Sequence, residues 1–155
     1  MGRKRFGINF KGADELIDKL YRLGGNLNPV VEQCLKVAPD IVNPQLKSEM
    51  AKHRRTGNVE ASIAEYQTVE WVGTKATIPV GFQFYKGGFP SIFLMYGTAR
   101  HAPYNQYGRG NGTNGGMNAD KRLYDAIYGA TTAKRINEKQ REIFEKEIAK
   151  RMGDK

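Results

Sequence analysis

Apolar residues recur every three or four positions near the start of the chain, the spacing that puts side chains on one face of a helix. The first such set is Leu16, Ile17, Leu20 and Leu23. Asp14 precedes this set as a capping residue, and Gly24-Gly25 follows it as a left-handed stop. We therefore expect a short amphipathic helix between these two signals.

A second and longer apolar stripe follows Asn28-Pro29, a cap with the proline that helices accept in their first turn. Its members are Val31, Cys34, Leu35, Ala38, Ile41, Val42, Leu46 and Met50. Pro39 and Pro44 interrupt the stripe, and each removes a backbone donor. The pattern predicts a long helix that is kinked or broken into two segments rather than a straight rod. Cys34 should act there as a small buried hydrophobe.

Beyond Val59 the helical period is lost. Residues 62–72, 75–84 and 89–98 are rich in β-branched and aromatic side chains and are separated by turns that contain glycine. This pattern predicts three antiparallel strands. The alternating run Phe6, Ile8 and Phe10 would add a fourth strand near the N-terminus.

The stretch from Ala99 to Asn118 is polar, rich in glycine and without periodicity, so it offers few apolar groups for packing. We expect a flexible loop there, and long insertions of this kind often carry a function. Its candidate protein-contact residues are Tyr104, Asn105, Tyr107 and Arg109.

Two helices are expected after the loop. Asp120 can cap a segment that carries Leu123, Ile127 and Tyr128 on one side. Thr132 can cap a charged final helix that extends to about Met152. The chain is then one α+β domain over residues 1–155, with N-terminal helices packed on a small antiparallel sheet of three to four strands and followed by C-terminal helices.

The charge of the chain indicates acidic partners. Its 155 residues carry a formal net charge of +9, which attracts polyanions or acidic protein faces. In the final helix most basic residues have acidic neighbours that can pair with them. Less compensated cations remain as candidate contacts to DNA or to an acidic partner: Arg3, Lys4, Arg5, Arg54 and Arg55.

The sequence contains no recognisable catalytic arrangement. His53, His101 and Cys34 lack the close spacing of zinc sites, and the glycine-rich loop lacks the Lys-Ser/Thr ending of a phosphate-binding loop. Ser62 is not in the glycine-flanked turn that exposes a hydrolase nucleophile. We therefore expect no enzyme activity, no cofactor and no metal. No signal peptide or membrane-spanning run is expected either.

The order of several short motifs resembles a known family. Gly12-Ala13-Asp14-Glu15-Leu16 precedes the long helix, Thr56-Gly57 and Ser62-Ile63 follow it, and Phe93-Leu94-Met95-Tyr96-Gly97-Thr98 precedes the loop. This order is similar to the tail-completion, or head-tail joining, family of tailed phages. Asn58-Val59 and Met95 depart from the residues usual in that family, which has a glutamate at the position of Met95.

The resemblance implies a structural virion protein of the phage neck. Such a protein is assembled in the host cytoplasm and forms a ring of copies, a hexamer by phage tail symmetry, that completes the tail end and joins it to the head connector. Its partners would be copies of itself, connector or stopper proteins and tail terminator or tail tube proteins, with non-specific contact to DNA in the channel. The candidate site residues that the resemblance implies are those of the family-motif turn and strand end: Thr56, Gly57, Tyr96, Gly97 and Thr98.

Two other hypotheses remain open. The net charge of +9 also suits a non-specific nucleic-acid-binding protein, and a small hydrolase or nuclease would use His53 or His101 with nearby acids. For Gly57 and Gly97 the alternative to a family-specific contact is a backbone conformation that requires the absence of a Cβ.

Overall fold

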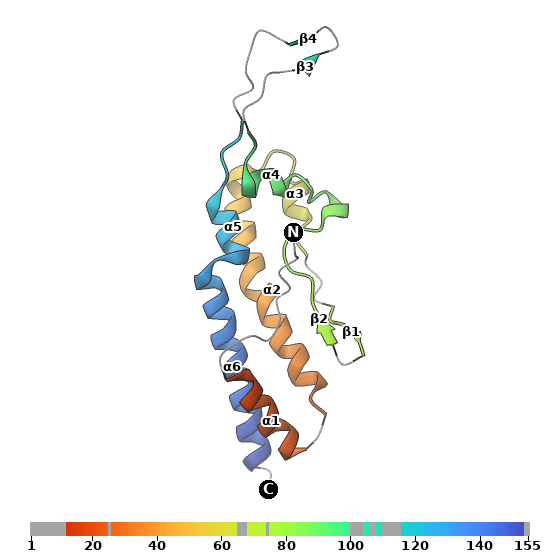
Figure 1. The fold of residues 1–155 in the computed structure, drawn as a ribbon, viewed down its shortest axis with the longest axis vertical. Helices are drawn as coiled ribbons and strands as arrows, with labels where there is room; N and C mark the ends of the chain where they lie inside the picture. Colours follow the sequence, from red (N-terminus) through yellow and green to blue (C-terminus); the bar gives the residue numbers. More distant parts are fainter. Residues whose placement is uncertain are drawn as a thin grey trace.

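The computed structural model of the chain describes residues 12–24, 26–64, 68–73, 75–99, 104–105, 108–109 and 116–153. Two long helices, α2 (Asn28–Met50) and α6 (Ala130–Gly153), pack side by side, as Figure 1 shows. At one end α1 (Ala13–Leu23) packs on α6. Towards the other end α5 (Lys121–Tyr128) packs on α2 and on α4 (Ser91–Tyr96).

Short elements complete the fold. The single turn η1 (Ala51–His53) and the helix α3 (Asn58–Ala61) follow α2, and the turn η2 (Phe84–Lys86) precedes α4. The strands β1 (Glu70–Val72) and β2 (Lys75–Thr77) form an antiparallel hairpin, with Trp71 opposite Ala76, and β2 contacts α2. A second hairpin joins β3 (Tyr104–Asn105) to β4 (Gly108–Arg109).

The buried apolar side chains form two clusters along the α2–α6 pair. The larger lies where α2, α4, α5 and the start of α6 meet, and it contains Ala38, Val42, Leu46, Met50, Ile63, Met95, Leu123, Ala126, Ile127 and Ile136. The smaller holds α1 against α2 and α6, and it contains Leu20, Val30, Cys34 and Phe144. Burial raises the pKa of the Cys34 thiol to about 12, so this residue is the buried hydrophobe that its place on the stripe predicts. α2 therefore contributes to both clusters, and α1 contributes Leu20 to the smaller one.

The helices of the first part of the chain differ from the prediction at their starts and at the prolines. α1 begins after Gly12, whose left-handed conformation (φ 90°) opens the helix, so Asp14 lies inside the first turn instead of capping it. The Asn28 amide donates to the Asn26 side chain at 2.9 Å, so Asn26 supplies the polar group that was expected from Asn28. α2 continues through both Pro39 and Pro44, so of the two predicted alternatives, a kink or a break into two segments, the break does not occur. Burial of its apolar stripe outweighs the backbone hydrogen bonds that the prolines remove.

The predicted α+β class is confirmed, but of the predicted three-stranded sheet only one antiparallel hairpin is. Among the described residues of 62–84, only β1 and β2 form a hairpin, and one isolated antiparallel bridge joins Ile63 to Phe82. Residues 91–96 are the helix α4, which buries Ser91 and Met95, four residues apart, beside α5. A strand would have turned Phe93 to the same side as these two residues, whereas Phe93 is 41% exposed. The predicted fourth strand at 6–10 lies outside the described residues.

The C-terminal helices confirm one predicted cap and correct the other. Asp120 Oδ1 accepts a hydrogen bond from the Arg122 amide at 2.9 Å and so caps α5. α6 begins at Ala130, two residues before the expected cap Thr132, which is buried. The Thr132 hydroxyl instead donates to the Asp125 carbonyl at 3.0 Å, so it supplies a hydrogen-bond donor to a carbonyl group in the last turn of α5. Among the described residues, no helix combines the length and the hydropathy needed to cross a bilayer.

Candidate functional site

The described motif residues lie at the end of the molecule formed by η1, α3, α4 and the start of α5 (Figure 1). Thr56 and Gly57 stand between η1 and α3, and Tyr96 to Thr98 stand at the end of α4. Hydrogen bonds connect these segments, because Asp120 contacts the His53 side chain and its amide donates to the Leu94 carbonyl at 2.7 Å. The folded chain thus brings to one end segments that are far apart in the sequence.

Thr56 and Gly57 have a structural role at the start of α3. Gly57 adopts a left-handed conformation with φ 80°, and its carbonyl accepts a hydrogen bond from the Ala61 amide at 2.9 Å. The Thr56 hydroxyl accepts from the Asn58 amide at 3.5 Å. These contacts explain the Thr-Gly pair as the local signal that begins a helix.

Gly97 and Thr98 close the base of the long loop. Gly97 has φ 72°, and a Cβ at this position would lie 2.5 Å from the Met117 carbonyl oxygen and 2.8 Å from the Ala119 nitrogen. The Thr98 amide donates to the Met117 carbonyl at 2.8 Å, and the Met117 amide donates to the Thr98 hydroxyl at the same distance. Both the backbone conformation and the close approach therefore require glycine at position 97.

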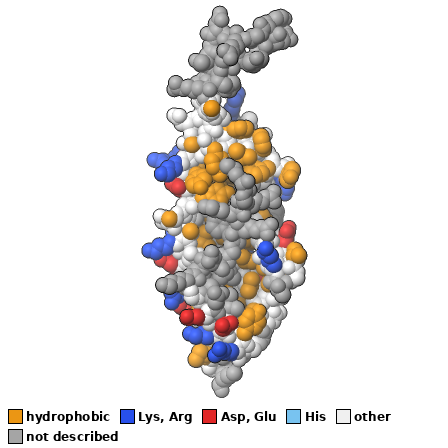
Figure 2. Space-filling view, viewed as in Figure 1, with side chains coloured by type: hydrophobic (Ala, Val, Ile, Leu, Met, Phe, Trp, Pro, Cys, Tyr) orange, Lys and Arg blue, Asp and Glu red, His pale blue; other side chains and the backbone are white. Residues whose placement is uncertain are grey.

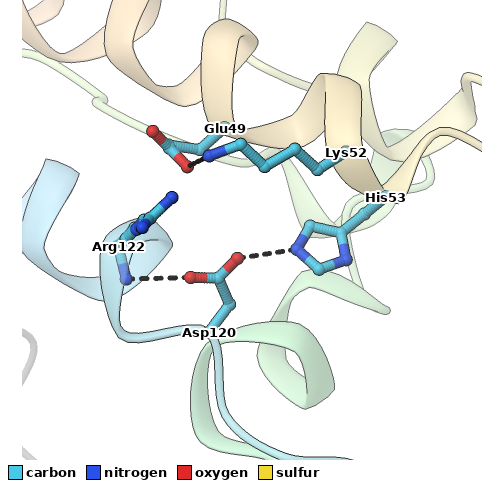
Figure 3. Close-up of polar contacts among 5 residues, drawn as sticks. All are labelled: Glu49, Lys52, His53, Asp120 and Arg122. Atoms are coloured by element: carbon cyan, nitrogen blue, oxygen red, sulfur yellow. Dashed lines mark hydrogen bonds and ion pairs between the residues drawn. The ribbon is translucent and has the colours of Figure 1, made fainter.

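His53 and Asp120 form a polar contact that the sequence analysis missed (Figure 3). The Nε2 atom of His53 lies 2.7 Å from Oδ2 of Asp120, while the other carboxylate oxygen accepts from the Arg122 amide. Beside them, Lys52 pairs with Glu49. The contact joins η1 to the first turn of α5 over 67 residues of sequence, and no local pattern signals a pairing at that distance.

This contact predicts a pH dependence of stability. The hydrogen bond with His53 is the main cause that holds the pKa of Asp120 below its usual value. A carboxyl whose pKa is lowered by folding stabilises the protein above its unfolded pKa of about 3.9, and this contribution is lost as the pH falls through the folded pKa. Asp120→Asn, which keeps a capping oxygen, should lower the free energy of unfolding by about 1 kcal/mol near pH 7.

Urea denaturation of both proteins at a series of pH values measures this effect. The difference between wild type and Asp120→Asn should shrink as the pH falls below about 4, because the wild-type carboxyl then takes up a proton. Asp18→Asn, which removes an exposed acid of α1, is the control for the change of net charge. A difference that is the same at neutral and at acid pH would contradict the expected role of the Asp120 charge.

One of the cationic residues predicted to contact DNA or an acidic partner already pairs within the chain. Arg54 forms a bidentate pair with Glu60, with Nε to Oε2 at 2.8 Å and Nη2 to Oε1 at 2.7 Å. Arg55 is exposed. The remaining candidates, Arg3, Lys4 and Arg5, lie outside the described residues, so the structure places only Arg54 and Arg55 of the five candidate cations.

Three of the four loop candidates, Tyr104, Asn105 and Arg109, lie on the second hairpin. Tyr104 is opposite Arg109 and Asn105 is opposite Gly108. Tyr107 and most of the expected loop at 99–118 lie outside the described residues, but the pairing shows that part of this stretch is regular. Figure 1 places β3 and β4 beyond the end formed by α4 and α5. The hairpin thus extends from the same end of the molecule as the motif residues.

The same end also carries exposed aromatic side chains, and all of them except Tyr85 lie in segments predicted to be strands. We call the following set, on η2, on α4 and between them, the aromatic surface: Phe84, Tyr85, Phe89, Phe93 and Tyr96. Each of these side chains is between 41% and 103% exposed. Figure 2 shows hydrophobic side chains gathered on this face in the region where Figure 1 places α3 and α4. An aromatic-rich segment was visible in the sequence, but its exposure was not.

The described residues also include a surface groove, and they include no cluster that could hold a metal ion. No group of three His, Cys, Asp or Glu side chains converges there as a metal site requires. A groove of about 640 Å³ between α2 and the α5–α6 junction is lined by both polar and apolar residues, among them Gln45, Ser48 and Ala126. Thr132 in this groove donates to the Asp125 carbonyl and lies 3.4 Å from the Gln45 side chain. In comparisons with known proteins, the chain matches no protein-family model, no curated protein and no solved structure.

Proposed function

We propose that this chain is a structural protein of a tailed-phage neck. Copies of it form a ring that completes the tail end and joins it to the head connector. The order of the motifs from Gly12 to Thr98 supports this proposal, because it is similar to that of the tail-completion family. The role is one of binding and assembly rather than of chemistry.

The aromatic surface is the observation that carries the proposal. Large aromatic side chains that stay exposed on a folded domain are typical of protein interfaces, where tyrosine and phenylalanine are enriched. Tyr85 is fully exposed, and Phe89 and Tyr96 are each 56% exposed. Left uncovered, a surface of this kind is a risk for aggregation, so it is typical of a protein with a binding partner.

The shape and the charge of the molecule also suit a ring. A closed ring repeats one contact between two unlike surfaces, and this elongated molecule presents different elements at its two ends (Figure 1). The formal net charge of +9 per copy makes an assembled ring strongly positive. Such a ring attracts acidic neighbouring proteins and the phosphates of DNA that passes through it.

Native mass spectrometry tests the proposal, on the purified protein alone and mixed with tail tubes from a phage mutant that lacks it. We expect a closed ring of copies in solution or on the tube. A monomer that ignores tubes and binds DNA in a salt-dependent manner would overturn the proposal and favour the alternative, a non-specific nucleic-acid-binding protein.

A further inference from the structure

We propose that the aromatic surface is the contact through which one copy of this chain binds the next. This inference rests on the proposed function, because it assigns the copy-to-copy contact of the ring to particular residues. Phe89 and Phe93 meet edge to face with their ring centroids 5.6 Å apart. Tyr96 meets Tyr124 of α5 at 5.8 Å, and Tyr124 in turn meets Tyr128 at 5.0 Å. An aromatic ridge therefore extends from α4 onto α5.

The size of this surface is suitable for a protein contact. Its five side chains are 41% to 103% exposed, and an aromatic side chain has an area of about 200 Å², so on the order of 600 Å² of aromatic surface faces solvent. The largest apolar patch on a typical monomer is about 300–600 Å². Each partner in a stable interface contributes roughly 800 Å². The aromatic surface alone supplies most of one side of such an interface.

The charge distribution favours a second copy as the occupant. Residues 87–98 contain no charged side chain, and Lys86 is the only charged residue between Gln83 and Thr98. An acidic partner would be attracted by cations, which this segment lacks. Two copies that each carry +9 repel one another, and they approach at least cost where charge is absent. Apart from Lys86, the segment that forms the aromatic surface is such a region.

The framework beneath the surface holds it in place before any contact forms. Ser91 and Met95 of α4 are buried in the core, and the Ser91 amide donates to the Gly88 carbonyl at 3.0 Å. At the other end of α4 the Leu94 carbonyl accepts from Asp120, and the Gly97 amide donates to the Phe93 carbonyl at 2.8 Å. A contact made by ordered side chains loses less conformational entropy on binding.

A double variant on α4 and its N-terminal flank tests the inference. Phe89→Ser with Phe93→Ser removes two exposed aromatic rings, and Tyr21→Ser with Met152→Ser is the matched control, because these side chains are 67% and 64% exposed on α1 and α6. Native mass spectrometry and sedimentation measure assembly, alone and on tail tubes, and circular dichroism measures folding. We expect the control to assemble as wild type does. The α4 variant should fold but show at least about a tenfold higher Kd between copies.

A cross-linking experiment identifies the occupant directly and does not depend on the stability of the variants. Cys34 is buried with a pKa of about 12, so it reacts poorly with maleimides in the folded protein. A cysteine introduced by Tyr85→Cys is therefore the site that a cross-linker with a maleimide and a photoreactive group labels. Photoactivation should yield a product that contains two copies of the chain.

The outcomes separate the inference from the proposed function. If wild type forms rings but the α4 variant assembles equally well, or if the product of Tyr85→Cys joins the chain to a tube protein, the inference is overturned and the neck function stands. If wild type remains a monomer both alone and with tubes, both are overturned.

Discussion

Phe144→Ala is expected to lower the free energy of unfolding by about 3–5 kcal/mol, the usual cost of removing a fully buried phenylalanine. The side chain is 1% exposed and lies among Leu20, Val30 and Cys34. This small cluster joins α1 to α2 and α6, and partly buried side chains such as Leu16 and Ile143 pack against it. For a chain of this size the midpoint of thermal unfolding should fall by roughly 10 °C.

Urea and thermal denaturation followed by circular dichroism measure this effect. Met152→Ala is the matched control, since Met152 lies on the same helix but is 64% exposed, and it should change the free energy of unfolding by less than about 0.5 kcal/mol. Equal stability of the two variants would show that the α1–α6 contact does not contribute to the folding transition.

Gly97→Ala is expected to cost about 2–6 kcal/mol, because two independent penalties combine. The backbone at φ 72° and ψ −179° belongs to a region that is essentially restricted to glycine, and another residue there costs about 1–3 kcal/mol. The added Cβ would also lie 2.5 Å from the Met117 carbonyl oxygen. The backbone would have to move to relieve this overlap, at a further cost of about 1–3 kcal/mol.

Gly24→Ala separates the two penalties. Gly24 has nearly the same backbone conformation, φ 76° and ψ 171°, but a Cβ there meets nothing within 4 Å. The Gly97 variant should therefore be the less stable of the two in urea denaturation. Its amide hydrogen exchange should also increase at Thr98 and Met117, whose mutual hydrogen bonds close the loop. Equal losses in the free energy of unfolding for Gly97→Ala and Gly24→Ala would mean that the Met117 backbone moves aside at no cost.

The segment at 89–98 shows where sequence reasoning failed. Its aromatic and β-branched residues have the composition of a strand, and Pro90 is compatible with either a strand edge or the start of a helix. The choice depends on what Met95 contacts. Because it packs in the core with Leu123 and Ile127, a helix that buries positions 91 and 95 is favoured, and Phe93 is left exposed.

The sequence by itself determined the existence of the two helices within residues 13–50 and of the two within residues 121–153. It also determined the Asp120 cap and the burial of Cys34. These features depend on residues three to four positions apart or on a cap beside its own helix, so local patterns suffice to predict them. Only the tertiary structure decided the helical state of α4, the His53–Asp120 contact and the exposure of the aromatic surface. Each of these depends on contacts between segments far apart in the chain, and such contacts outweigh the weak local preference of a short segment.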